Sequence, residues 1–361
     1  MRRLILALCT FAAAHCAQAQ SSKMCFLPAI AEISGSIWVD GTLWVLADGG
    51  NAAKLYSIDT ATGSIKDSTT FQNASNIDWE ELTLNNTSVF IGDFGNNRGQ
   101  RRNLRVFRFD RLQLGQQDVF CDTISFSYAE QTDFANNPFT IYDCEAMIAF
   151  EDSLILFSKS WADLACRVYA IPTKPGSYTT RYLQTLQPGK LVTGACTFSN
   201  KVVLCCYGYN GQFQPGLTVL DIGTTPLFEN AKNLGIGLSH AVQLESIAHI
   251  DSTALYLTAE ASNNSEATLY LHQEKTLTMR HLDESETTTL QVYPNPASEV
   301  LHLSKPFQGC AAVIYNKLGV REFMCRDIGE GIPISNLAAG VYILKTETTA
   351  GIRSIQFTVK H

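Results

Sequence analysis

The chain from residue 32 to residue 282 repeats one pattern of apolar and polar positions five times. Each repeat holds a short apolar strand, a turn, a strongly apolar strand, a polar loop and a further strand. The strongly apolar strands span residues 43–47, 89–92, 154–158, 202–206 and 255–259. The repeats begin 48, 65, 49 and 51 residues apart, and four short strands in about 40–50 residues are typical of a β-propeller. The pattern predicts an all-β chain with a five-bladed β-propeller; six blades or an irregular β-sandwich are the alternatives.

The first 19 residues have the features of a secretory signal peptide. Arg2 and Arg3 precede an apolar run over residues 4–14, and Ala17-Gln18-Ala19 provides an A-x-A cleavage site. We expect cleavage after Ala19. No later stretch approaches the roughly 18 consecutive apolar residues of a membrane span, so the sequence predicts no transmembrane segment.

Composition favours a folded chain and argues against nucleic-acid binding. Hydrophobic residues make up 45% of the chain and charged residues 17%, which is ample material for a core. The formal net charge is −7, whereas a protein that binds a phosphate backbone needs clustered basic surface.

The segment 290–361 follows a polar linker, residues 283–289, and differs from the repeats. It contains Tyr293-Pro294-Asn295-Pro296, the hairpin motif Ile314-Tyr315-Asn316 followed by Gly319, and Gly340-Val341-Tyr342. Its alternating apolar and polar positions predict a small β-sandwich. These motifs resemble the C-terminal sorting domain (type A) of the type IX secretion system. The predicted organisation is therefore a signal peptide (1–19), a propeller (20–282), a linker (283–289) and a sorting domain (290–361).

The resemblance implies that residues 290–361 engage the type IX secretion machinery. It also implies a protein that is secreted, extracellular or attached to the outer-membrane surface, and it says nothing about the activity of the repeats. Two cysteines flank the predicted hairpin in this segment. If Tyr315 faces Val320, then Cys310 faces Cys325, and a cross-strand disulfide is geometrically possible.

Aligning the five repeats brings acidic residues to equivalent positions. The position that opens each repeat holds Glu32, Glu80, Glu145, Gly194 and Glu245, and the position after the second strand holds Asp48, Asp93, Lys159, Tyr207 and Glu260. In a propeller both positions lie on one face near the central axis. A shared Asp-x-Gly-Asn motif adds Asn51 and Asn96. The sequence predicts a ligand-binding face made of Asp48, Asn51, Asp93, Asn96, Lys159, Tyr207 and Glu260.

Carboxylates that converge on one axis repel each other unless a cation compensates them. Candidate metal ligands are Glu32, Glu80, Glu145 and Glu245, and Ca²⁺ is the candidate cofactor because it accepts oxygen ligands. The alternative is structural, because a side chain repeated in four blades can tie adjacent blades through backbone hydrogen bonds. Trp79 and Trp161 border the same predicted face and are candidates for a sugar platform.

Two functions of different classes are compatible with this sequence. The primary interpretation is a secreted or surface-displayed propeller that binds a glycan or protein ligand on its acidic face. The alternative is a metal-dependent hydrolase, lactonase- or glycosidase-like, in which the four glutamates hold the cation and Asp93 acts as general base. No H-E-x-x-H, P-loop or G-x-G-x-x-G motif identifies a reaction.

Overall fold

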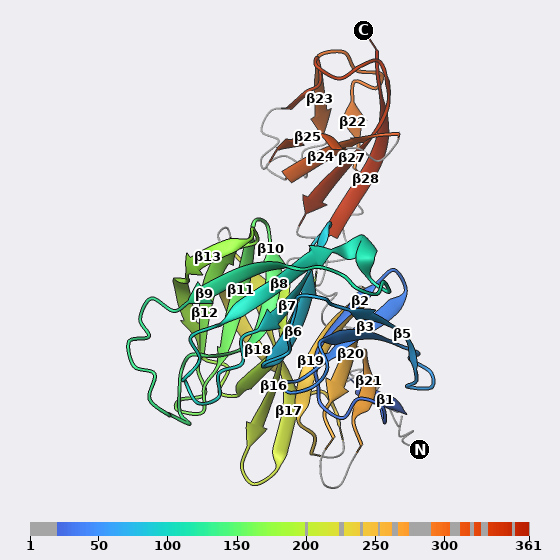
Figure 1. Cartoon of the computed structure of the whole chain (residues 1–361). Helices are drawn as coiled ribbons and strands as arrows, with labels where there is room; N and C mark the ends of the chain where they lie inside the picture. Colours follow the sequence, from blue (N-terminus) through green and yellow to red (C-terminus); the bar gives the residue numbers. More distant parts are fainter. Residues whose placement is uncertain are drawn as a thin grey trace, which may run out of the picture. The chain divides into compact units, whose positions relative to one another are not determined.

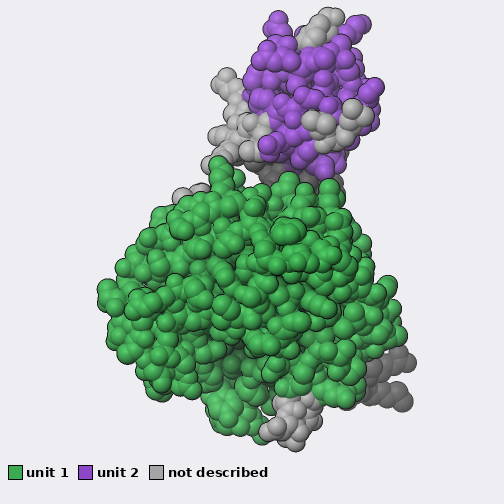
Figure 2. All heavy atoms as spheres, in the orientation of Figure 1, with its two compact units in different colours: residues 1–278 green, residues 279–361 purple. Residues whose placement is uncertain are grey.

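The computed structural model describes residues 20–198, 201–223, 227–238, 241–251, 253–261, 266–273, 290–303, 311–317, 321–325, 331–348 and 351–360. The expected signal peptide and the linker 283–289 lie outside these ranges. The chain divides into two compact units, Met1–Thr278 (unit 1) and Met279–His361 (unit 2), which Figure 2 colours separately. In the part of the chain that the structure describes, no helix is long and apolar enough to cross a membrane.

The described residues of unit 1 form five sheets and one short 3₁₀ helix, η1 (Arg111–Gln113). The first sheet contains β2 (Ile33–Val39), β3 (Thr42–Ala47), β4 (Lys54–Ile58) and β5 (Ile65–Thr70). The second contains β6 (Trp79–Leu84), β7 (Ser88–Asp93), β8 (Arg105–Asp110), β9 (Asp122–Ser127) and, parallel to β9, β13 (Gly176–Thr179). The third contains β10 (Asp143–Phe150), β11 (Ser153–Lys159), β12 (Cys166–Pro172) and β14 (Arg181–Leu186). The fourth contains β15 (Leu191–Phe198), β16 (Lys201–Tyr209), β17 (Phe213–Ile222) and β18 (Phe228–Leu234). The fifth contains β19 (Leu244–Asp251), β20 (Ala254–Ala259), β21 (Thr268–Gln273) and β1 (Gln20–Phe26).

The five sheets follow one another around a common centre (Figure 1). Each sheet has one innermost strand, and these five strands contact one another in a closed cycle. In this cycle β2 contacts β6, β6 contacts β10, β10 contacts β15, β15 contacts β19 and β19 contacts β2. The N-terminal strand β1 completes the fifth sheet by pairing with β21, with Ser21 opposite His272. The first and the last described strands of unit 1 are therefore neighbours in one sheet. Sequence patterning alone did not reveal β1, because its partner lies at the other end of the unit.

The strongly apolar second strand of each sheet is packed on both of its faces. Every residue of β7 and of β20 is buried. Trp44 from the first sheet and Trp79 and Phe107 from the second belong to one core cluster between the two sheets. This explains why these strands are continuously apolar instead of alternating. The longest interval between repeats, before Glu145, holds η1 and the loop 128–142.

The described residues of unit 2 form two sheets around one core. The smaller sheet contains β22 (Val292–Tyr293), β23 (Val300–Leu303) and β26 (Ile332–Pro333). The larger contains β25 (Arg321–Cys325), β24 (Ala311–Asn316), β27 (Gly340–Thr348) and β28 (Gly351–Val359). Leu301 and Ile332 from the first pack with Ile314, Leu344 and Phe357 from the second. Sheet-on-sheet packing of this kind follows from the alternating pattern of the segment.

The hairpin between β24 and β25 has a different register from the one expected. Ala312 lies opposite Cys325, and Tyr315 lies opposite Arg321. The pairing shifts between Ile314 and Tyr315, and such a bulge displaces every later pair along the strands. The expected alignment of Cys310 with Cys325 is therefore not the observed one. Cys310 itself lies outside the described residues.

Candidate functional site

All five inner strands contain a β-bulge at the same place. The residues skipped by the pairing are Ser34, Glu80, Glu145, Thr193 and Glu245. A bulge re-aims the side chain of the extra residue and bends the strand. Four of these five side chains, all except that of Thr193, line one cavity. The bulges thus place one residue from each sheet around the centre of unit 1.

The two hydroxyl residues at the bulges tie neighbouring sheets together. The Ser34 hydroxyl donates to the Trp79 carbonyl of the second sheet at 2.8 Å. The Thr193 hydroxyl donates to the Leu244 carbonyl of the fifth sheet at 2.7 Å. An ionised carboxylate has no proton to donate in this way. These two hydroxyl groups therefore bridge neighbouring sheets as donors, whereas the bridging role expected for the glutamates was to accept backbone N–H groups.

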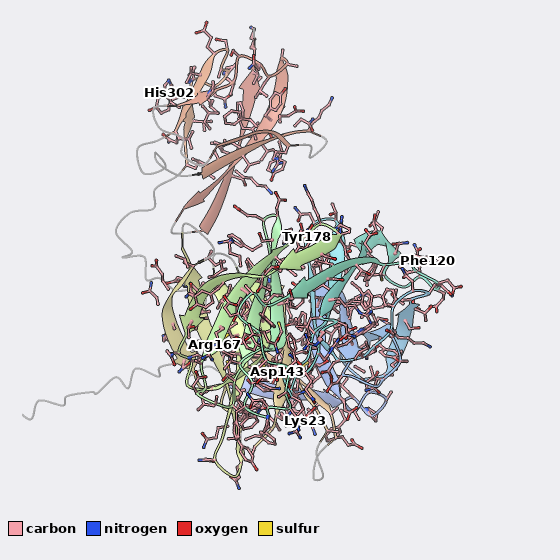
Figure 3. All side chains as sticks on the ribbon, turned by 60° about the vertical axis from the view of Figure 1, so that its left-hand side comes forward. Lys23, Phe120, Asp143, Arg167, Tyr178 and His302 are labelled. Atoms are coloured by element: carbon pink, nitrogen blue, oxygen red, sulfur yellow. The ribbon has the colours of Figure 1, made fainter. Side chains whose placement is uncertain are left out.

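Two of the residues aligned at the opening position of the repeats, Glu32 and Gly194, do not lie at the bulges. In the first sheet the bulge is at Ser34, and Glu32 lies two residues earlier. The residues that match Glu32 are Asp78 in the second sheet and Asp143 in the third. Figure 3 labels Asp143. In the fourth sheet the bulge is at Thr193, one residue before Gly194. Asp78 and Asp143 were missed because the alignment followed glutamates and not bulges.

Asp93 does not occupy the position expected from its motif. It pairs directly with Trp79, so the residue that matches Asp48, Lys159, Tyr207 and Glu260 is Phe94. The Asp93 side chain is fully buried, with Arg101 Nη2 at 2.9 Å and Arg105 Nε at 2.8 Å. It also accepts the backbone N–H of Asp78 at 3.0 Å. Since it does not line the cavity, Asp93 is an anchor of the second sheet and is not placed to act as a general base there.

The two asparagines of the shared motif support the cavity without lining it. Asn51 donates to Glu32 Oε2 at 3.0 Å and to the Asp48 carbonyl at 3.1 Å. Asn96 is buried and donates to the Tyr142 carbonyl at 3.1 Å, while its side-chain oxygen accepts from the Arg101 backbone N–H. Both side chains therefore position neighbouring groups.

The cavity at the centre of unit 1 has a volume of about 490 Å³. Its lining residues are Glu32, Ser34, Asp48, Glu80, Asn97, Glu145, Lys159, Trp161, Tyr207, Tyr209, Phe213, Gln243, Glu245 and Glu260. Eight of the residues predicted for metal or ligand binding are in this set, namely Glu32, Asp48, Glu80, Glu145, Lys159, Tyr207, Glu245 and Glu260. Among the other predicted residues, Asn51, Asp93 and Asn96 do not line it.

The cavity has two chemically different sides. The acidic wall comes from the first, second and fifth sheets and consists of Glu32, Asp48, Glu80, Glu245 and Glu260. The aromatic wall comes from the third and fourth sheets and consists of Trp161, Tyr207, Tyr209 and Phe213. Its rings contact one another, with centroids 6.3 Å apart for Trp161 and Tyr209 and 5.2 Å apart for Tyr207 and Phe213. Trp79, the other sugar-platform candidate, is fully buried in the core. Tyr209 and Phe213 had no signal in the repeat alignment.

Lys159 is the cation among the cavity-lining residues, and it is already paired. Its Nζ lies 2.6 Å from Glu145 Oε1, and the two side chains are 9% and 2% exposed. Burial raises the pKa of Glu145 well above its usual value, and Lys159 opposes this rise. Burial also raises the pKa of Glu260 to about 7 and that of Glu245 to about 8. The wall therefore holds more carboxyl groups than the nearby cations can compensate.

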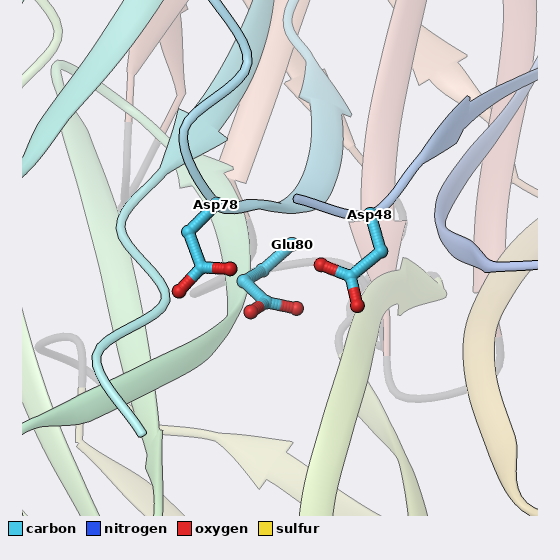
Figure 4. A group of neighbouring side chains, drawn as sticks. All are labelled: Asp48, Asp78 and Glu80. Carbon is cyan, nitrogen blue, oxygen red and sulfur yellow. The ribbon is translucent and has the colours of Figure 1, made fainter. Parts of the chain in front are cut away.

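Three carboxylates form the tightest group, here called the acidic trio. One oxygen each of Asp48, Asp78 and Glu80 lies within 4.8 Å of the others (Figure 4). Asp48 follows β3, whereas Asp78 and Glu80 flank the start of β6. Burial, with Asp48 as the strongest like charge, raises the pKa of Asp78 to about 6. Among the described residues, these three carboxylates have oxygens close enough to share one ion, and of the four glutamates expected as metal ligands the group includes Glu80.

The comparisons assign one segment of the chain to a family. The family described as "Secretion system C-terminal sorting domain" matches residues 291–360. Among curated proteins there is no match to this chain.

Several solved structures match this chain at low identity and low TM-score. PorZ of Porphyromonas gingivalis, a surface component of the type IX secretion system, is 15% identical with a TM-score of 0.34; the match covers 92% of this chain and 46% of PorZ. An exo-β-1,3-galactanase of Phanerochaete chrysosporium is 9% identical with a TM-score of 0.46, covering 92% of this chain and 90% of that one. A GH62 α-L-arabinofuranosidase of Coprinopsis cinerea is 10% identical with a TM-score of 0.45, covering 72% and 97%. This chain thus spans about half the length of PorZ, and likenesses at these TM-scores assign it no activity.

Proposed function

We propose that unit 1 is a five-bladed β-propeller whose central cavity binds a carbohydrate. Residues 291–360 belong to the secretion system C-terminal sorting domain family and mark the chain for export to the cell surface or extracellular space. The blade number rests on the closed cycle of contacts between the five inner strands. The binding role rests on the opposition of the acidic wall and the aromatic wall across one cavity.

This combination of walls suits a sugar. A sugar ring offers an apolar C–H face that packs on an aromatic side chain, and hydroxyl groups that donate to carboxylates. Trp161 and Tyr209 are 42% and 55% exposed, so their rings are available to a ligand. The volume of about 490 Å³ lies within the usual range for small-ligand sites. An anionic ligand is disfavoured because the carboxylates outnumber the cations.

A glycan array probed with the mature chain, followed by calorimetry on the best saccharide, tests this proposal. We expect saturable binding that Trp161→Ala weakens by about tenfold or more, equivalent to about 1.4 kcal/mol. The matched control is Phe120→Ala, which removes an aromatic ring that is 69% exposed and lies outside the cavity (Figure 3). Binding of no saccharide, or equal loss in both variants, would contradict the proposal. Saturable binding of a protein instead would favour a protein ligand for this face.

A hydrolase at the same cavity is the second candidate. The observation that favours it is a pair of lining carboxyl groups, Glu245 and Glu260, that both interact with the Gln243 amide and whose pKa values are raised to about 8 and about 7. Groups that titrate near neutrality are suited to proton transfer. Incubation of the mature chain with lactones and aryl glycosides, with and without Ca²⁺, tests it. Turnover that Glu260→Gln abolishes would support the hydrolase, and no turnover of any compound would leave binding as the function.

A further inference from the structure

We propose that Asp48, Asp78 and Glu80 form a binding site for one calcium ion at the acidic wall of the cavity, to which Asp48 and Glu80 contribute and behind which Asp78 lies. The ligand set differs from the one expected from the repeats. Asp78 precedes β6, Asp48 follows β3, and only Glu80 is a bulge residue. The proposal does not depend on the identity of the organic ligand.

The first argument is the state of the Glu80 side chain. Glu80 is only 5% exposed and lines the cavity, yet it forms no hydrogen bond or ion pair with any residue in the described ranges. Figure 4 shows its carboxylate between those of Asp78 and Asp48. A carboxylate buried in this way is unfavourable by several kcal/mol when ionised, and a cation bound beside it would offset that cost.

The second argument is the commitment of the nearby cations. Arg101 Nη1 is 4.0 Å from Asp78, but the same guanidinium donates to the Gly95 carbonyl at 2.8 Å and to Asp93 at 2.9 Å. Lys159 is held by Glu145 at 2.6 Å. The protein therefore supplies no close cation to Glu80 or Asp48 among the described residues.

The third argument is the spacing and its support. Calcium binds oxygen at about 2.3–2.6 Å, so two oxygens on the same ion lie at most about 5 Å apart, and the trio oxygens are within 4.8 Å of one another. Two glycines allow this close approach. A Cβ on Gly95 would lie 2.1 Å from Glu80 Oε1, and one on Gly49 would lie 2.5 Å from Asp78 Oδ1. Any side chain at either position would push into the trio.

The test uses the mature chain and Ca²⁺ alone, freed of metal beforehand and titrated by calorimetry. We expect one ion per chain and a thermal midpoint that rises with Ca²⁺, since an ion that binds only the native state stabilises it. Glu80→Gln and Asp78→Asn, which keep the shape of the side chains, should each weaken binding by tenfold or more. The matched control is Glu229→Gln, an exposed glutamate on β18 outside the cavity, which should bind within about threefold of the wild type.

Two results would overturn the proposal. One is the absence of heat and of any thermal shift up to about 10 mM Ca²⁺, well above the dissociation constants of extracellular calcium modules. The other is binding that Glu80→Gln leaves intact or that Glu229→Gln weakens equally. No saccharide is present in this experiment, so failure of the carbohydrate proposal would leave its result unchanged. Conversely, loss of the ion site would not affect the Trp161→Ala comparison.

Discussion

Replacing Lys159 by Met should destabilise unit 1 by up to about 3 kcal/mol at pH 7. Lys159 Nζ is 2.6 Å from Glu145 Oε1 inside the cavity, and the substitution leaves the buried Glu145 carboxylate beside Asp143 and Glu245. Glu145 must then bind a proton in the folded state. Holding that proton costs about 1.4 kcal/mol for each pH unit above the ordinary pKa of 4.5, or about 3 kcal/mol at pH 7. This is the upper limit of the penalty, because burial already raises the pKa of Glu145 in the wild type and Lys159 only opposes that rise. Removing one partner of a buried ion pair costs about 3–5 kcal/mol in general.

The sign of the pH dependence follows from the same step. A proton that the folded state binds more tightly than the unfolded state stabilises the protein below the unfolded pKa and loses that effect as the pH rises. The penalty of Lys159→Met relative to the wild type should therefore be small at pH 5 and large at pH 8. Adding Glu145→Gln should remove most of the penalty, because no carboxylate is then left uncompensated.

Urea unfolding followed by tryptophan fluorescence measures this effect. The four tryptophans, Trp38, Trp44, Trp79 and Trp161, all lie in unit 1, so the signal reports that unit alone. Lys201→Met is the matched control, because Lys201 pairs with Asp221 with side chains 28% and 27% exposed, and such pairs contribute about 1 kcal/mol or less. A penalty below 1 kcal/mol that does not change between pH 5 and pH 8 would refute the reasoning.

Three further predictions follow from the fold and the acidic wall. Glu81 is fully buried and accepts the N–H groups of Leu82 at 2.9 Å and Ala195 at 2.8 Å. Glu81→Leu should therefore lower the free energy of unfolding in urea by about 2–4 kcal/mol, and an unchanged midpoint would show that these donors find other partners. Burial raises the pKa values of Glu260 and Glu245 to about 7 and about 8, so the folded state binds these two protons more tightly than the unfolded state. Unit 1 should therefore be less stable by roughly 2 kcal/mol or more at pH 9 than at pH 5. Urea midpoints that do not change with pH would count against the burial of these groups. Deleting residues 290–361 should stop delivery to the surface or medium in a host with the type IX system; fractionation that still finds the protein outside would contradict the sorting role.

The sorting segment was recognisable from the sequence because its signal is local. Tyr293-Pro294-Asn295-Pro296 and Gly340-Val341-Tyr342 are short motifs that are read without knowing the tertiary structure, and the family match to residues 291–360 confirms the resemblance. The repeated apolar strands were equally visible, because strands packed on both faces must be continuously apolar. The sequence also indicated that acidic residues converge, and eight predicted residues line one cavity.

The tertiary structure decided which of those residues face one another. Side chains alternate between the two faces of a strand, so an offset of one residue reverses the direction of a side chain. The bulge at Glu80 makes Phe94, and not Asp93, the match of Asp48, and this sends Asp93 to its arginines instead of the cavity. The same bulge makes Asp78 the match of Glu32, and this places its carboxylate in the acidic trio. A bulge is defined by the pairing of two strands, and the local sequence of one strand does not reveal how it pairs. The pairing of β1 with β21 could not be predicted for a related reason, because these strands are far apart in the sequence.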